Sequence, residues 1–291
     1  MASTRDIRRQ IKSKKDTQQI TKAMKMVSAA KLRRAQEKVV AARPYAAKME
    51  QVVASVANSS GGRHPMLVSR PVKKTGYIVI AADRGLAGAY NAQVIRRTLS
   101  EIGDRTPDQY AIVAVGRRAR DFFSKRNYPM LGEIVGLPDF PTFSDIKTVT
   151  ELVVKLYQDE VFDELYLVYN KFISPIQQTP VVKKVLPLED LTDSNEVPKS
   201  TTGFKASYTY EPSPERVLDS LLPKFAETQI YSALLEAKAS EQGARMTAMD
   251  SATKNASEMI DTLTLALNRA RQSAITLQIM EIVGGAEALK S

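Results

Sequence analysis

Small and apolar residues recur at alternating steps of three and four near both ends of this 291-residue chain. That spacing is typical of a coiled-coil seam, because it keeps one stripe of a helix facing its partner. We therefore expect two long helices, over 3–57 and from 213 to about 289, paired antiparallel around small side chains. The first seam comprises Leu32, Ala35, Val39, Ala42, Ala46, Met49, Val53 and Val56. The second comprises Ala252, Ala256, Met259, Leu263, Ala266, Ala270, Ser273, Leu277 and Met280.

Three local features refine these two helices. Ser213 and Pro214 suit the cap and the first helical position of the C-terminal helix. Pro44 lies inside the N-terminal helix, where its ring should bend the backbone. Upstream of Leu32 the seam is expected to blur, since the apolar residues there hold no single register: Ile7, Ile11, Ile20, Met24 and Val27.

Between the helices, strand and helix patterns alternate. Apolar runs predict strands over 77–82, 110–116 and 164–172, and amphipathic runs predict helices over 91–102, 117–126 and 144–160. Two edge strands are expected over 179–188 and 204–210, with a polar surface loop over 191–202. The predicted fold is α/β plus coiled coil: long helices in 1–60 and 212–291, and a central Rossmann-like, doubly wound α/β domain in 72–211. Residues 58–63 are predicted to be a flexible joint.

Composition removes much of the usual catalytic chemistry. The chain has no Cys and a single His, which excludes disulfides, thiolate catalysis and zinc fingers. No run of about 18 apolar residues suggests a membrane span. The N-terminus is charged from Arg5 onward and lacks the apolar stretch of a signal peptide, so we expect a protein that is not exported.

The net charge of +10 is concentrated at one end of the chain. Residues 1–57 carry 14 Lys and Arg against 4 Asp and Glu, whereas positive and negative charges nearly balance in the remainder. A basic helix of this kind favours a nucleic acid, an anionic membrane surface or an acidic protein as its partner.

The loop Asp83–Asn91 follows a predicted strand and opens a helix, which is where α/β folds bind phosphate groups. It contains neither G-x-G-x-x-G nor G-x-x-x-x-G-K-[ST], so we interpret it as a turn with two glycines and an Asx start. A Rossmann-type enzyme is for the same reason a weak hypothesis.

Two other groups of polar residues are interpreted without catalytic roles. His64 is predicted to be a lone exposed loop histidine, away from any cluster of acidic or hydroxyl groups. A cluster of four carboxylates is predicted to solubilise a loop: Asp159, Glu160, Asp163 and Glu164. No catalytic residue, cofactor site or metal site is predicted.

Three motifs are distributed along the chain. The first is ITKAMKMV at 20–27, followed by AAKL at 29–32. The second is DRGL at 83–86, with Gly88 and Asn91. The third is ASEQGARM at 239–246, together with NRARQ at 268–272. In their order and spacing along the whole chain, these motifs resemble those of the γ subunits of F-type ATP synthases.

This resemblance implies a non-catalytic rotating central stalk. Its expected partners are three α and three β subunits, the ε subunit and the membrane c-ring, with proton flow turning the stalk and the stalk driving the β sites in turn. No organellar presequence precedes Ser3, so we expect a bacterial protein on the cytoplasmic side of the cell membrane, associated with the membrane only through the complex.

The resemblance also implies contact residues. Contacts to the β subunits are expected at Arg271, Gln272, Met24, Lys25, Arg245, Asp83 and Arg84. Contacts to the c-ring and ε are expected at Tyr208, Tyr210 and Glu211. The alternative from another class is a basic coiled-coil protein that binds nucleic acid with steep salt dependence. The basic helix has no aromatic stacking residue before Tyr45, which weakens that alternative.

Overall fold

The computed structural model describes residues 4–60, 64–188, 210–211 and 213–288. The chain divides into two compact units, one formed by 29–245 and the other by 1–28 with 246–291. Two long helices run through both units: α1 (Thr4–Ser59) and α6 (Pro214–Ala288). Both confirm the predicted helices at the chain ends, and α1 continues without a break through Pro44.

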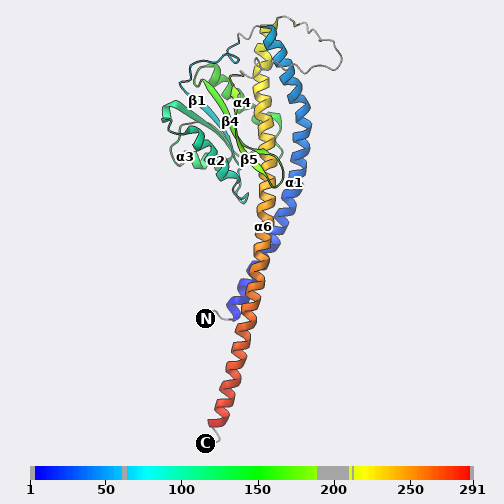
Figure 1. Ribbon diagram of the computed structural model, residues 1–291, viewed down its shortest axis with the longest axis vertical. Coiled ribbons are helices and arrows are strands. Elements are labelled where there is room, and N and C mark those ends of the chain that lie inside the picture. Colours follow the sequence, from blue (N-terminus) through cyan, green and yellow to red (C-terminus); the bar gives the residue numbers. More distant parts are fainter. Residues whose placement is uncertain (1–3, 61–63, 189–209, 212, 289–291) are drawn as a thin grey trace. The chain divides into compact units, whose positions relative to one another are not determined.

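A five-stranded sheet forms the centre of the 29–245 unit (Figure 1). Its order is β3-β2-β1-β4-β5, and only β5 runs antiparallel to its neighbour. The strands are β1 (Thr75–Ile80), β2 (Tyr110–Val115), β3 (Met130–Ile134), β4 (Glu164–Phe172) and β5 (Gln178–Leu186). All residues of β1 and β2 are buried, as expected for parallel strands that are covered on both faces.

Helices cover both faces of this sheet. On one face, α2 (Tyr90–Ile102) and α3 (Arg117–Ser124) pack in a core with Tyr77, Ile112 and Val168. On the other face, α4 (Phe143–Gln158) shares a core with parts of α1 and α6, including Val53 and Leu222. A short 3-10 helix, Pro107–Gln109, precedes β2. The predicted elements between 77 and 188 are confirmed to within two residues. The predicted loop at 191–202 lies outside the described residues, as does the predicted strand at 204–210 except for Tyr210.

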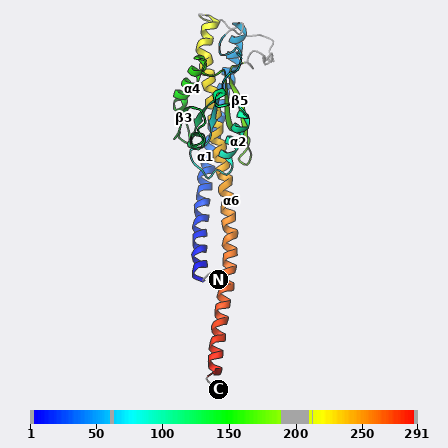
Figure 2. The same ribbon diagram turned by 90° about the vertical axis from the view of Figure 1, so that its left-hand side faces the viewer.

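In the unit formed by 1–28 and 246–291, α1 and α6 lie side by side and run antiparallel (Figure 2). Thr21 contacts Thr253, and four residues later Lys25 contacts Asp250. Counting outward from these contacts in threes and fours places Ile11 opposite Leu263 and Ile7 opposite Leu267.

The predicted blurring of the α1 seam is wrong. Buried or half-buried positions continue in steps of three and four from Ser28 back to Ile7, through Lys25, Thr21, Gln18, Lys14 and Ile11. The apolar residues at Ile20 and Val27 lie on the opposite, exposed side of the helix. The heptad register is therefore unbroken, and polar side chains occupy its inner positions.

The α6 seam also differs from its prediction. Ile260 and Leu267 are half-buried, whereas Met259 and Ala266, which the pattern placed in the seam, are exposed. From Arg271 to Gly285 every residue is exposed, because α1 begins at Thr4 and so offers no partner beyond Ala270. At the other end of α6, the Ser213 hydroxyl accepts a hydrogen bond from the Arg216 backbone N–H at 3.4 Å, which confirms the predicted cap.

Candidate functional site

Two motifs that lie 150 residues apart in the sequence meet in the 29–245 unit. The Tyr90 hydroxyl donates to the Ala237 carbonyl at 3.0 Å, and the Arg245 guanidinium donates to the Gly85 carbonyl at 3.4 Å. Ala244 packs on a small cluster formed by Ala82, Ala87 and Tyr90. The loop after β1 is thus fixed directly to α6.

Arg245 itself is buried in an ion-pair network. Only 9% of Arg245 and 6% of Glu241 are exposed, and Nη2 of Arg245 lies 2.7 Å from Oε1 of Glu241. Lys238 Nζ lies 3.8 Å from the other carboxylate oxygen. Burial raises the pKa of the neighbouring Tyr90 hydroxyl well above its ordinary value, and the Glu241 charge raises it further. The structure therefore places Arg245, an expected β contact, on partners within its own chain.

Side-chain hydrogen bonds hold both ends of the loop Asp83–Asn91 in place. Oδ1 of Asp83 accepts hydrogen bonds from the backbone N–H groups of Arg117 and Gly136, each at 3.0 Å. Oδ1 of Asn91 accepts from the Ala82 N–H at 2.9 Å. Both side chains therefore bind backbone groups. The predicted Asx start is wrong, because an Asx turn needs a partner two residues on, whereas the partners of Asp83 lie 34 and 53 residues away.

The outer part of the same loop faces solvent. Arg84 and Leu86 are exposed, and Leu86 has a left-handed φ of +62°. A left-handed backbone is unfavourable for a leucine, so the surrounding turn holds this apolar side chain outward. Leu86 is a candidate contact residue that the sequence alone did not indicate.

Gly243 permits a close approach of α6 to the turn between β4 and β5. A side chain at this position would place its Cβ 3.3 Å from both the Gln178 amide nitrogen and the Pro175 carbonyl oxygen. The glycine of the third motif therefore has a packing role.

The two residues of α1 that were expected to contact the β subunits lie on the side of the helix that faces α6. Met24 and Lys25 are half-buried, and Lys25 pairs with Asp250 at 2.6 Å. The exposed apolar residues of this stretch are Ile20, Met26 and Val27, at 60%, 61% and 54% exposure. The signal that would have identified them is the heptad count, which assigns the inner positions to polar residues.

The other expected contact residues fall into three groups. Arg271 and Gln272 are exposed on α6 and precede a series of exposed apolar side chains: Ile275, Leu277, Ile279, Met280, Ile282 and Val283. Tyr210 is half-buried, with its hydroxyl 2.9 Å from Ser55 Oγ, whereas Glu211 is exposed. Tyr208 lies outside the described residues.

The prediction for His64 is wrong. Its side chain is only 13% exposed, and Nε2 lies 3.1 Å from Oδ1 of Asp219. Nδ1 accepts a hydrogen bond from the Met66 backbone N–H, so Nε2 carries the ring proton in this arrangement. Burial lowers the pKa of His64, and the nearby Asp219 opposes that shift.

Two of the four clustered carboxylates are also not solubilising loop charges. Glu164 begins β4, and its side chain is only 16% exposed and lies 3.5 Å from Lys184 Nζ. Asp163 is buried and accepts hydrogen bonds from Arg70 Nε and from the backbone N–H groups of Lys73 and Lys74. These hydrogen bonds and the Arg70 charge hold its pKa below the ordinary value, although burial alone would raise it. The carboxylate joins the segment before β1 to the start of β4.

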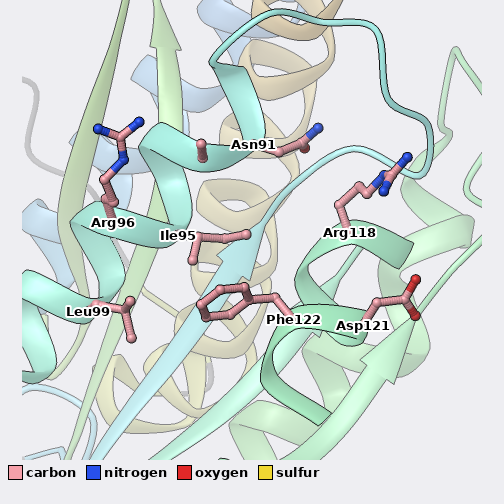
Figure 3. A pocket seen from close by; sticks show the side chains of 8 residues that line it. Asn91, Ile95, Arg96, Leu99, Arg118, Asp121 and Phe122 are labelled. Carbon is pink, nitrogen blue, oxygen red and sulfur yellow. The ribbon is translucent and has the colours of Figure 1, made fainter. Parts of the chain in front are cut away.

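A cleft of about 470 Å³ lies between α2 and α3 (Figure 3). Ile95, Leu99 and Phe122 form its apolar floor, and the charged groups of Arg96 and Arg118 lie on opposite sides and point apart. The cleft therefore has no converging set of catalytic groups. In the part of the chain that the structure describes, no group of His, Asp and Glu could hold a metal ion. Among the described residues, no helix is both long enough and apolar enough to cross a membrane.

Comparison with known proteins covers the whole chain. A family model described as ATP synthase matches residues 3–289. The chain is 59% identical over 287 residues to a protein of Brevibacillus brevis named ATP synthase gamma chain, covering 98% of each. It is 53% identical to the protein of that name from Desulforamulus reducens, over the full length of both.

Solved structures share the fold at lower identity. A chain from the OSCP, F1 and c-ring part of Euglena gracilis mitochondrial ATP synthase matches with a TM-score of 0.68 and 18% identity, covering 98% of this chain and 94% of that one. A chain from the central stalk and c-ring of the Tetrahymena thermophila mitochondrial enzyme matches with a TM-score of 0.60 and 23% identity, covering 80% of this chain and 99% of that one.

Proposed function

This chain belongs to the ATP synthase gamma chain family, and from that premise we propose that it is the rotating central stalk of an F-type ATP synthase. It is a non-catalytic subunit of the complex. In this role it couples proton flow through a membrane c-ring to the conformational cycle of the β subunits. Three α and three β subunits surround it, and ε binds beside it. The chain lies on the cytoplasmic side of a bacterial cell membrane and is associated with the membrane only through the complex.

The observation that carries this proposal is the part of α6 beyond the helix pair. Residues 271–285 are all exposed, and six large apolar side chains lie among them, up to 71% exposed at Ile282. Exposed apolar surface of this extent marks an interaction site. Few charges interrupt the segment, so an apolar sleeve could hold it without fixing one rotational angle.

The surface contacts that we propose for the β subunits follow from exposure. On α1 they are Ile20, Met26 and Val27, which replace the inward-facing Met24 and Lys25 as the direct contacts. On α6, Arg271 offers a planar guanidinium for a paired hydrogen bond with a carboxylate, beside Gln272. The basic residues of 1–57 suit acidic segments on the surrounding subunits, because charge complementarity steers association over a distance.

The loop after β1 and the region before α6 supply the remaining proposed contacts. Arg84 and Leu86 form the outer surface of the loop and are its proposed contacts, while Asp83 shapes the turn from within. The proposed contacts to the c-ring and ε are Tyr208, Tyr210 and Glu211. The Tyr210 hydroxyl forms a hydrogen bond with Ser55 of α1, which fixes the position of this segment, and Glu211 is exposed.

Reconstitution tests the proposal. The chain is mixed with separately purified α and β subunits, and ATP hydrolysis is assayed with and without it. We expect a 3:3:1 complex whose hydrolysis depends on the chain and in which a bead fixed to the 29–245 unit rotates. A chain that forms no such complex but binds DNA with an affinity falling steeply with salt would overturn the proposal.

A further inference from the structure

A polar layer crosses the antiparallel helix pair between α1 and α6. Oγ1 of Thr253 lies 2.8 Å from Oγ1 of Thr21 and 2.7 Å from the Met249 carbonyl of its own helix. Thr21 is only 8% exposed, and its hydroxyl donates to the Gln18 carbonyl. Four residues along α1, Lys25 Nζ lies 2.6 Å from Oδ1 of Asp250.

The Asp250 carboxylate is held from two sides. Lys25 reaches it from α1 and Lys254 reaches it from one turn farther along α6, at 3.1 Å. Hydrogen bonds from these two lysines lower the pKa of Asp250. Lys25 and Asp250 are each partly shielded from solvent, at 44% and 33% side-chain exposure.

The rest of this seam is made mainly of apolar contacts. On α6 they come from Ala256, which is buried, and from Leu263 and Leu267, which are half-buried. Such contacts are non-directional, so they favour burial of the two helices against each other without requiring one particular pairing. A slip by one heptad would instead place Lys25 opposite Ser257 and Thr21 opposite Ile260. Polar groups at inner positions are a known means of fixing coiled-coil register.

We propose that the Thr21–Thr253 and Lys25–Asp250 contacts form a register lock, which holds α1 and α6 in one axial alignment within the unit formed by 1–28 and 246–291. The lock rests on the proposed stalk function, because a shaft built from two helices transmits torque only if they do not slide past each other. These four are positioning residues: they face each other, and the outer surface of the helix pair remains available to partners.

Disulfide trapping tests the lock in the full chain assembled with α and β. The chain has no native cysteine, so an introduced pair supplies its only thiols. Ile11→Cys with Leu263→Cys reports the native register, and Ile11→Cys with Ala270→Cys reports a slip of one heptad. In the otherwise native chain we expect oxidation to trap the first pair and leave the second reduced.

Lys25→Asp places two carboxylates in contact and should raise the yield of the slipped disulfide about tenfold, since a hydrogen bond to a charged group is lost and repulsion added. Lys25→Asp combined with Asp250→Lys recreates the pair between the helices and should lower the slipped yield again, incompletely because the exchange places a second lysine beside Lys254. The matched control is Lys22→Asp, which makes the same charge change at an exposed position of α1 and should leave the ratio unchanged.

A second variant guards against failure of Lys25→Asp to assemble. Thr21→Val with Thr253→Val keeps the side-chain shape and removes the hydroxyl contact, and should raise the slipped yield about threefold. An unchanged ratio in every assembled variant, or no rescue by the exchanged pair, would overturn the lock. Failure of the native chain to assemble with α and β would instead overturn the proposed function, so the two outcomes are distinguishable.

Discussion

At the residue scale, the Glu241 carboxylate lies between two cations inside the 29–245 unit. Arg245 is the nearer at 2.7 Å and Lys238 the farther at 3.8 Å, and all three residues are at most 9% exposed. Removing one member of a buried ion pair is costly because the other charge remains in a medium of low dielectric constant. Arg245 also donates to the Gly85 carbonyl, so this network joins α6 to the loop after β1.

The network predicts an order among its variants. Glu241→Gln leaves two buried cations without a carboxylate and should lower the free energy of unfolding by about 3–5 kcal/mol. Arg245→Ala leaves Glu241 with Lys238 and should cost less, about 3 kcal/mol. Denaturant unfolding checks both values. The control Arg84→Ala removes an exposed arginine and should stay within about 0.5 kcal/mol of the native chain. A larger loss for Arg245→Ala than for Glu241→Gln would contradict the assigned geometry.

His64 predicts a second effect at this scale. Burial lowers its pKa below the ordinary value of 6.5, so the folded chain binds the proton less readily than the unfolded chain. Its stabilising contribution is therefore complete above pH 6.5 and is lost as the pH falls through the folded pKa. Between pH 7.5 and 5, the thermal unfolding midpoint of the native chain should fall more than that of His64→Gln, as circular dichroism would record. Equal falls would show that His64 carries no pH dependence.

At the scale of elements, the sequence predicted the strands and helices more reliably than the faces that they bury. Continuous apolar runs marked β1 and β2 because both faces of a central parallel strand are covered. In the first 28 residues the usual relation between polarity and burial is reversed. Thr21 and Ser28 are buried, whereas Ile20 and Val27 are exposed. A pattern that equates apolar with buried cannot detect this inversion, and only the heptad count extended from Leu32 places these side chains.

At the scale of the whole molecule, the motifs identified the family, but they did not show where individual residues lie in the fold. The motifs at 83–91 and 239–246 indicated the family, yet nothing in their spacing showed that Tyr90 and Arg245 contact each other's segments. Such contacts depend on how β1, α2 and α6 pack, which the order of elements does not specify. Buried charges were missed for the same reason, as Asp163 shows: its partners Arg70, Lys73 and Lys74 lie about 90 residues earlier in the chain.

The last prediction concerns the end of α6 and separates chain stability from assembly. A chain ending at Ala270 loses only residues that are exposed wherever the structure describes their side chains, so its thermal unfolding midpoint should match that of the full chain. A chain ending at Gly284 should still form the complex with α and β, because Arg271, Gln272 and all six of the large exposed apolar side chains remain. The chain ending at Ala270 should assemble with lower yield and support less hydrolysis, since the surface proposed to lie in the sleeve is gone. Gel filtration and hydrolysis assays of both chains provide the measurement. If the chain ending at Gly284 fails to assemble, the residues after it are needed to hold the stalk, and the exposed apolar side chains up to Val283 are not sufficient.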